Sequence, residues 1–381
     1  MQKLIYFVSE WCRKWRFTIN PKKSKVVHFR NSPKKRSSYQ FTLTPNGTPI
    51  ETIKEYKYLG VILDEYLTYN SAIEVISKSA SRALGSMITK FRRMKNMGYD
   101  TYKTLYHAYV CPILDYGSEI WGGKSHQSLE NVQNKAMRYY TAVHKYAPIL
   151  GYQGDMAYVS NRNRWKVNMI RYWNKLLKVD VNRILKCVFD YDTNTCNNNF
   201  KCSFANNVKQ ILCDNGMKAN YVNKLPVDLN NLKNLLFQNQ MKEWQDHIEH
   251  KPKLNFLSSF KSSLGKEKYL MLNISRYEIS LLSQLRYGIL PLRVETGRFR
   301  NEKRDDRLCN MCKNNEIEDE EHFLYRCTFY SEEREQLYNK TKMSNQLNST
   351  EKSKLLFTQY VRQFAKYVKN IYIKRRNCIY K

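Results

Sequence analysis

The sequence predicts an α+β protein, with a short β-rich segment at the N-terminus followed by a mostly α-helical chain. Residues 16–63 contain short β-prone runs separated by turn signals. From residue 72 onward, apolar residues recur at steps of three and four, which is the period of an amphipathic helix. The chain has 381 residues, of which 42% are hydrophobic. This is long and apolar enough for two or three compact units with their own cores.

The β-rich segment is predicted from four runs and the turns between them. The runs are 26–29, 41–44, 48–50 and 56–63. Asn20-Pro21 is a turn signal before the first run. Asn46-Gly47 separates the second from the third and indicates a hairpin, because both residues tolerate a positive φ. The last run is predicted as one strand, with Gly60 inside it permitting close approach of another backbone.

The helical region is predicted to begin with a helix over 72–94. Its apolar stripe consists of Ile73, Ile76, Ala80, Ala83, Met87, Phe91 and Met94. Basic residues in its last turn suit the helix dipole, and Gly98 is predicted to end it. Further helical patterns cover 101–110, 128–144, 160–178, 229–249, 266–286 and 352–373. Trp165, Met169, Trp173 and Leu176 are interpreted as a core face. Linkers are expected at 194–199 and 290–307.

The charge of the chain points to a polyanionic partner. The 65 Lys and Arg residues outnumber the 34 Asp and Glu residues, for a formal net charge of +31. Such an excess repels itself unless a polyanion neutralises it. Nucleic acid is the first candidate, an acidic membrane surface the second, and a Lys-rich solvated surface the alternative. The 29 tyrosines, interleaved with basic residues, suit base stacking. RNA and DNA both remain open as partners.

Export and membrane insertion are not expected. The apolar run 4–8 is too short for a signal peptide and is interrupted by Glu10. No run of about 18 apolar residues is present, so no membrane span is predicted. The ten cysteines are therefore interpreted as reduced thiols or metal ligands, and the expected location is intracellular, in the nucleus or the cytoplasm. The basic runs Lys34-Lys35-Arg36 and Lys374-Arg375-Arg376 are candidate nuclear localisation patches.

One group of cysteine and histidine residues has the spacing of metal ligands. Cys309, Cys312, His322 and Cys327 follow the pattern C-x2-C-x9-H-x4-C. Four such ligands favour a closed, structural zinc site rather than a hydrolytic one. If the His-x4-Cys half lies on a helical turn, that turn must be distorted for the two side chains to converge. The alternative is a set of small core residues in chance register.

The surroundings of this group are mixed in charge. Five acidic residues lie within it and are predicted to orient His322 rather than to bind phosphate: Glu316, Glu318, Asp319, Glu320 and Glu321. Flanking basic residues are candidates for phosphate contacts: Lys303, Arg304, Arg307, Lys313 and Arg326.

Several stretches, in order, resemble LINE-type (non-LTR, jockey-like) retrotransposon reverse transcriptases. Residues 11–29, WCRKWRFTINPKKSKVVHF, resemble the segment after the active-site strands, with matches at Trp15, Ile19, Asn20, Lys23, Ser24, Lys25 and Phe29. Residues 56–64, YKYLGVILD, resemble the strand that holds the primer end. The helix at 72–94 and residues 109–121, YVCPILDYGSEIW, are similar to the thumb. A Cys-Cys-His-Cys knuckle often follows the thumb in this family.

The resemblance implies five parts. These are the end of a polymerase palm (1–70), a helical thumb-like region (71–190), a helical connection region (191–300), a CCHC zinc knuckle (301–335) and a basic helical tail (336–381). The residues that it implies for contact with RNA or DNA are Lys22, Lys23, Lys25, Tyr58, Leu59, Gly60, Lys90, Arg92, Arg93 and Lys95. The knuckle is linked in the family to binding template RNA or target DNA.

The resemblance also implies what this fragment does not do. Polymerases of the family use a Tyr-x-Asp-Asp step that should precede Trp11, and only ten residues do so. We therefore expect no catalytic residue and no catalytic magnesium in this truncated RNA-directed DNA polymerase fragment. Asp305-Asp306 lacks flanking strands and is rejected as a catalytic pair. The competing interpretations are a helical adaptor for protein partners and a decayed retroelement product without activity.

Overall fold

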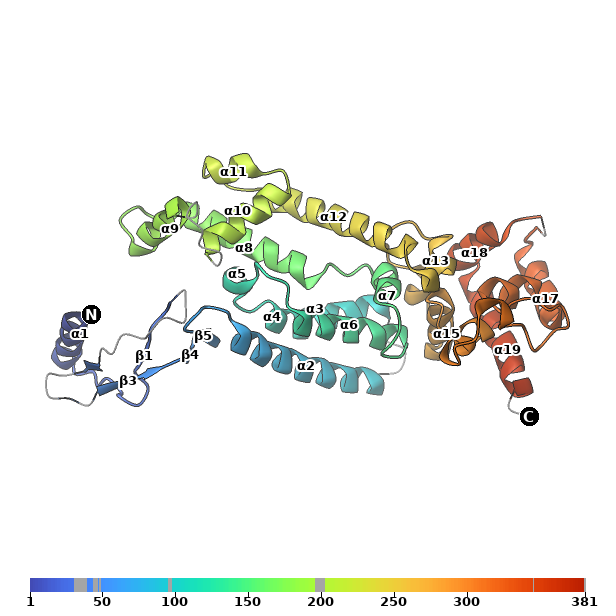
Figure 1. The fold of residues 1–381 in the computed structure, drawn as a ribbon, viewed down its shortest axis with the longest axis horizontal. Coiled ribbons are helices and arrows are strands. Elements are labelled where there is room, and N and C mark those ends of the chain that lie inside the picture. Colours follow the sequence, from blue (N-terminus) through green and yellow to red (C-terminus); the bar gives the residue numbers. More distant parts are fainter. Residues whose placement is uncertain are drawn as a thin grey trace.

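The computed structural model describes residues 1–30, 40–43, 47, 49–94, 98–195, 203–344 and 346–379. The molecule is elongated, with α1 and the strands at one end and the C-terminal helices at the other (Figure 1). Helices dominate, and the short strands lie before residue 65. The prediction of an α+β chain with a β-rich start and a helical remainder is therefore confirmed.

The N-terminal region begins with a helix that the sequence analysis did not predict. This helix, α1 (Gln2–Lys14), contains no buried side chain. Phe7, Trp11 and Trp15 are about half to two-thirds exposed, and Trp11 stacks on Phe17. Gln2 anchors the helix to β2 through hydrogen bonds to both the N–H and the carbonyl of Thr42. The helix is thus held mainly by its polar contacts.

The first strands pair as the turn signals predict. β3 (Pro49–Ile53) runs parallel to β1 (Lys25–Val27) and antiparallel to β2 (Phe41–Thr42). The antiparallel pairing confirms the hairpin expected around Asn46-Gly47, although Asn46 lies outside the described residues. The turn before β1 is also confirmed, because the Asn20 side chain accepts hydrogen bonds from the N–H groups of Lys22 and Lys23.

The prediction of a single strand over 56–63 is wrong. The segment folds into a hairpin of β4 (Glu55–Tyr58) and β5 (Val61–Asp64). Leu59 and Gly60 form its two-residue turn, with φ of +45° and +87°. Such a turn matches the twist of the flanking strands but needs positive φ at both positions. The turn was not apparent from the sequence, because a bulky apolar residue such as Leu59 seldom adopts a positive φ.

The long helices match their predicted ranges. They are α2 (Asn70–Arg93), α3 (Tyr99–Tyr109), α6 (Gln127–Thr141), α8 (Asn161–Leu177) and α12 (Leu229–Glu249). The α2 stripe is buried except for Ala83, which is partly buried, and Met94 at its end, which is 57% exposed. The predicted core face of α8 is confirmed, since Trp165, Met169 and Trp173 are fully buried and Leu176 is nearly so. Periodicity thus identified the helices that cross the core.

Four boundary predictions are wrong. The range 266–286 splits into α14 (Lys268–Met271) and α15 (Arg276–Arg286), and Ser275 caps α15. The range 352–373 splits into α18 (Ser349–Thr358) and α19 (Val361–Ile379). Gly98 begins α3 rather than ending α2. The expected linker over 290–307 contains α16 (Arg293–Phe299) and buries Leu290 and Leu292.

The remaining helices are shorter. They are α4 (Cys111–Leu114), α5 (Ser118–Trp121), α7 (Ile149–Met156), α9 (Ile184–Thr195), α10 (Phe204–Asp214), α11 (Lys218–Val222), α13 (Asn255–Ser258) and α17 (Ser331–Thr341). The predicted linker at 194–199 begins in the last turn of α9 and otherwise lies outside the described residues, as do Cys196 and Cys202.

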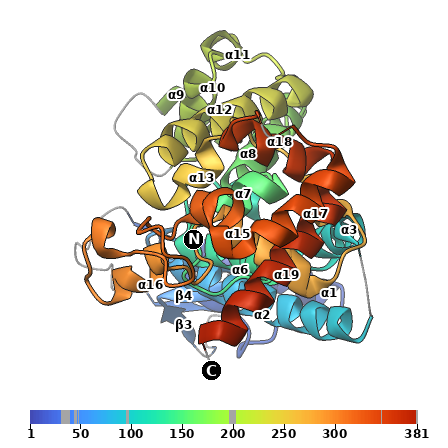
Figure 2. The ribbon, with the colours of Figure 1, turned by 90° about the vertical axis from the view of Figure 1, so that its right-hand side faces the viewer.

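A large core of buried apolar side chains runs from Ile73 in α2 to Ile371 in α19. Another links α8 to α9, α10 and α12. Seen from the C-terminal end, α15, α17 and α19 lie together in front of the rest (Figure 2). The first core crosses residues 190 and 300, so the five-part division remains a prediction. In the described part of the chain, no helix combines the length and apolarity needed to cross a bilayer.

Candidate metal centre and nucleic-acid interface

The Cys309–Cys312 loop is built by a small antiparallel ladder. Leu308 and Ile317 form a β-bridge, and the Cys309 N–H donates to the Glu316 carbonyl at 2.8 Å. The Met311 N–H then turns back toward the Cys309 Sγ at 3.4 Å. An N–H directed at the sulfur stabilises a thiolate, and a two-residue gap lets both sulfurs face one point.

The His322–Cys327 half lies on a distorted helical turn, as the sequence analysis required. In an α-helix, residues five apart point about 140° away from each other. Here His322–Arg326 is a π-helical turn, closed by a hydrogen bond from the Cys327 N–H to the His322 carbonyl at 2.8 Å. The Asp319 carboxylate accepts a hydrogen bond from the His322 N–H and so fixes the start of this turn. The wider turn brings both side chains to one side.

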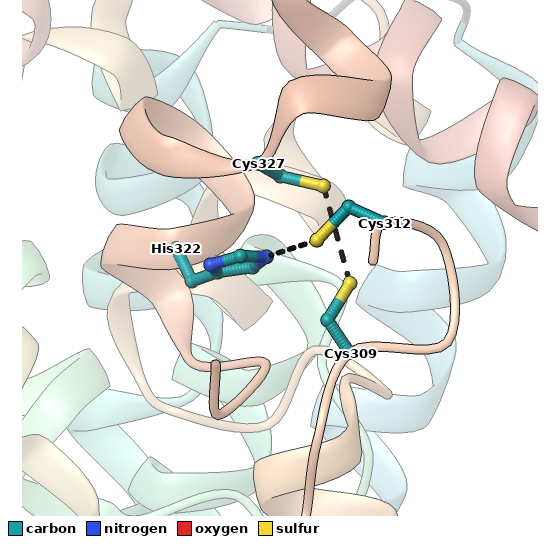
Figure 3. A group of neighbouring side chains, drawn as sticks. All are labelled: Cys309, Cys312, His322 and Cys327. Carbon is teal, nitrogen blue, oxygen red and sulfur yellow. Dashed lines mark hydrogen bonds between the residues drawn. The ribbon is translucent and has the colours of Figure 1, made fainter. Parts of the chain in front are cut away.

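The four donor atoms converge on one point (Figure 3). They all lie within 4.8 Å of one another. Cys309 Sγ and Cys327 Sγ are 3.9 Å apart, and Cys312 Sγ is 3.4 Å from His322 Nε2. A tetrahedral zinc with its usual bond lengths needs about 3.8 Å between two sulfurs and about 3.5 Å between sulfur and nitrogen. The cluster can therefore hold zinc, and its donor set fits that ion.

Glu316 orients the histidine. Its carboxylate lies 3.2 Å from His322 Nδ1, which leaves Nε2 facing the sulfurs. Burial lowers the pKa of the His322 imidazole, but hydrogen bonds to Cys309 and Glu316 outweigh burial and raise it to about 9. A hydrogen bond with Cys327 lowers the pKa of the Cys309 thiol. A metal ion must therefore displace protons from the cluster as it binds.

The basic residues near the cluster are largely engaged within the protein. Arg326 contacts the carboxylates of Glu316, Asp319 and Glu321. Arg307 donates to the backbone carbonyls of Val294 and Glu302. The remaining members of the predicted set, Lys303, Arg304 and Lys313, are exposed.

The cluster is fastened to the C-terminal helices. Buried Glu318 accepts two hydrogen bonds from Arg375 of α19, each 2.7 Å long, and a third from the Arg293 N–H. The Tyr367 hydroxyl donates to the Leu324 carbonyl at 2.7 Å. Lys374 pairs with Glu333. Two of the three cations in the predicted patch 374–376 therefore have internal partners, and the patch Lys34-Lys35-Arg36 lies outside the described residues.

The predicted primer-end residues lie at the tip of the β4–β5 hairpin. Tyr58 and Leu59 are 58% and 75% exposed. The hairpin rests on the turn between α4 and α5, where the Tyr116 hydroxyl donates to the Leu59 carbonyl at 2.5 Å. A Cβ on Gly60 would lie 3.2 Å from the Tyr116 ring. Tyr116 was not among the contact residues predicted from the sequence, although it lies in the stretch 109–121 that was predicted to resemble a thumb.

The other predicted contacts form two separate groups. Lys22 and Lys23 are exposed. They lie beside the hairpin, because the Tyr56 hydroxyl donates a hydrogen bond to the Lys23 carbonyl. Lys25, in contrast, forms an ion pair with Glu51. The second group is Lys90, Arg92 and Arg93, which lie in the last turn of α2, about 33 Å along the helix from its first residue, Asn70. Lys95 lies outside the described residues. The structure therefore does not bring all the predicted residues to one place.

Asp305 and Asp306 lie on an exposed 3-10 turn, Arg304–Asp306, and no strand carries them. Their rejection as a metal-binding pair for polymerisation stays a prediction.

Known proteins resemble part of the chain. It is 25% identical over 141 residues to the probable RNA-directed DNA polymerase from transposon BS of Drosophila melanogaster. It is 28% identical over 133 residues to the RNA-directed DNA polymerase from mobile element jockey of Drosophila funebris. It is also 28% identical over 144 residues to the probable RNA-directed DNA polymerase from transposon X-element of Drosophila melanogaster.

The matched stretches cover 36%, 35% and 37% of this chain, but only 15%, 14% and 15% of the three relatives. No family model and no solved structure matches the chain. Over about a third of its length, the chain is thus related to the polymerases of jockey-like retrotransposons, which confirms the resemblance at that level.

Proposed function

We propose that residues 1–381 are the RNA- and DNA-binding part of a retroelement reverse transcriptase, downstream of its polymerase centre. The observation that carries this proposal is the likeness to RNA-directed DNA polymerases, which spans 36% of the chain in the transposon BS match. The net charge of +31 supports it, because so large an excess needs a polyanion to neutralise it.

Within this function, we assign a structural zinc ion to Cys309, Cys312, His322 and Cys327. Bound zinc would cross-link the two halves of the cluster. With four protein donors, a tetrahedral zinc ion would have no position left for a reacting water. Glu316 holds the imidazole in the orientation that presents Nε2, and Glu318 joins the site to α16 and α19. The site would therefore fix the C-terminal helices rather than perform chemistry.

We also propose that this chain alone does not synthesise DNA. Metal-assisted phosphoryl transfer requires carboxylates that hold two metal ions at the primer end. Asp305 and Asp306 lie on an exposed turn, remote in sequence from the hairpin. Primer extension with purified protein, an RNA template and magnesium should give no product. Metal-dependent extension would contradict this part of the proposal.

The binding function is tested by titrating the purified full chain into a fluorescein-labelled oligouridylate and following anisotropy. Affinity should fall roughly a hundredfold between about 50 and 200 mM salt if some five phosphates are contacted. Affinity that is absent at low salt would overturn the proposal and favour a decayed product. Binding to a protein partner that does not change with salt would instead favour the adaptor.

A further inference from the structure

Two surface hollows meet at Arg138 on α6. One, of about 800 Å³, lies between α2, α6 and residues 145–149, with Ser77, Lys135, Lys145 and Tyr146 among its lining residues. The other, of about 510 Å³, lies at the ends of α2 and α6 and the start of α15, and it is lined by Arg92, Tyr139 and Arg276 among others. We refer to the two hollows together as the α2–α6 groove.

The α2–α6 groove is cationic throughout. Its basic side chains are Arg92, Lys135, Arg138, Lys145 and Arg276. Among the described residues that line it, none carries a carboxylate. The hollow beside the metal cluster differs, since it combines arginines with Glu295, Asp319, Glu320 and Glu321. The charge of the groove is therefore left for a ligand to neutralise.

Aromatic contacts hold the arginines in position. The guanidinium of Arg276 lies 4.3 Å from the centre of the Tyr139 ring, and that of Arg92 lies 5.7 Å from it. Arg276 also donates to the Tyr139 carbonyl. Arg138 lies 5.9 Å from the Tyr152 ring and donates to its hydroxyl. These partners orient the cations without cancelling their charge, so the cations stay available to an anion.

The dimensions of the groove suit a polyanion rather than a single phosphate. Along α6 and the residue that follows it, the groove extends from Ser128 to Ala142, which is about 21 Å. Phosphates of a stacked strand advance about 3.4 Å each along the axis, and those of an extended strand advance further, so the groove spans several phosphates. Ser128 and Asn131 also line the groove, and their hydroxyl and amide groups can donate to phosphate oxygens.

One aromatic ring at the groove is free to stack. Tyr146 is 74% exposed, and Lys145 lies 4.8 Å from the centre of its ring. A tyrosine beside cations is the arrangement by which proteins bind single strands, because a base can stack on it only when that base is unpaired. The ring therefore favours a single strand over a blunt duplex.

We propose that the α2–α6 groove binds a single strand of nucleic acid, with phosphates on its five cations and an unpaired base on Tyr146. The inference rests on the proposed nucleic-acid binding and specifies where it occurs. Apart from Arg92, none of these cations belongs to the set predicted from the sequence. We therefore place the principal contact surface in the groove, while the contacts predicted at the hairpin stay a prediction.

The test compares two triple variants of the full chain. Lys135→Gln, Lys145→Gln and Arg276→Gln remove three exposed cations from the groove. The control, Lys218→Gln, Lys233→Gln and Arg362→Gln, removes three exposed cations outside its lining. Each triple variant lowers the net charge by the same amount. Arg138 is left unchanged because its contact with Tyr152 contributes to packing.

Binding is measured with the fluorescein-labelled oligouridylate, after circular dichroism has shown that each variant is folded. The groove variant should bind at least about thirtyfold more weakly than wild type at moderate salt. Its plot of log affinity against log salt should also be shallower by about 2. The control should stay within about threefold of wild type. Equal weakening by both variants, or by neither, would overturn the assignment of the groove.

A second pair of variants tests the stacking role. Tyr146→Ala should weaken binding of the oligouridylate at least about fivefold, while Tyr146→Phe retains the ring and should bind as wild type does. Equal affinity of the Ala and Phe variants would contradict the stacking.

If wild type binds tightly and the groove variants match it, only the groove inference fails. If wild type does not bind at all, the proposed function itself fails.

Discussion

The metal cluster and the α2–α6 groove differ in whether their cations are paired with carboxylates. At the cluster, carboxylates surround and pair the cations, and Glu318 is buried against Arg375. In the groove, five cations converge, and no carboxylate is found among the described lining residues. Charged side chains that stabilise a fold are usually paired within the protein, whereas charged side chains that bind a ligand are left unpaired in its absence. This difference supports the structural role proposed for the cluster and the binding role proposed for the groove.

Loss of a cluster ligand should produce the largest effect on stability. Structural zinc contributes about 10–16 kcal/mol in small metal-dependent domains, which exceeds the stability of many whole domains. Cys309→Ser should therefore release the metal and unfold the region around α17–α19. Metal content and thermal unfolding by circular dichroism measure this. Cys213→Ser, at an exposed cysteine, is the control. Retained zinc and an unchanged melting temperature in Cys309→Ser would contradict the assignment.

The buried ion pair below the cluster should have the next largest effect. Arg375→Gln leaves the carboxylate of Glu318 buried with only the Arg293 N–H as a partner. Removing one member of a buried pair costs about 3–5 kcal/mol. Arg376→Gln changes the adjacent exposed residue and should cost less than about 0.5 kcal/mol. Urea unfolding compares the two, and equal midpoints would show that the pair does not support the fold.

Removing the orienting carboxylate should weaken metal binding without unfolding the chain. Glu316→Gln preserves the shape of the side chain but loses the charge beside His322 Nδ1. Zinc affinity, measured by competition with a chelator, should fall about 10- to 100-fold. Glu332→Gln, on the exposed side of α17, is the matched control. An unchanged affinity would mean that Glu316 has no part in orienting the ligand.

The smallest effect should come from the cations flanking the cluster. Lys303→Gln with Lys313→Gln removes two exposed charges whose neighbours in the sequence include Glu302, Asp305 and Glu316. Because those carboxylates repel phosphate, oligouridylate binding should change by less than about threefold. A loss as large as that of the groove variant would reverse the comparison and make the cluster the binding site.

Local pattern was sufficient for the metal ligands and the long helices. The spacing from Cys309 to Cys327 identified all four residues whose donor atoms converge, and it required the distorted turn that the structure contains. The apolar period located α2, α6 and α8. It failed to detect the breaks before α15 and α19, because the period continues across a short interruption that only capping residues and tertiary contacts define.

The groove could not be predicted from local pattern. Its basic residues come from separate parts of the chain. Lys135 and Arg138 lie on α6, Arg92 lies on α2, Lys145 follows α6, and Arg276 belongs to a helix more than a hundred residues later. Charge runs drew attention instead to the basic residues of 90–95, and among those that the structure describes, Arg92 alone lines the groove. The Leu59-Gly60 turn was missed for a different reason, since a leucine at positive φ is a conformation that the surrounding fold imposes.

Hydrogen–deuterium exchange of the full chain, with and without the oligouridylate, tests the division between structure and binding most directly. Amides in 128–149 and around Arg276 should exchange more slowly in the complex, while those in 309–327 should be unchanged. Protection confined to 309–327, with none in 128–149, would contradict the account.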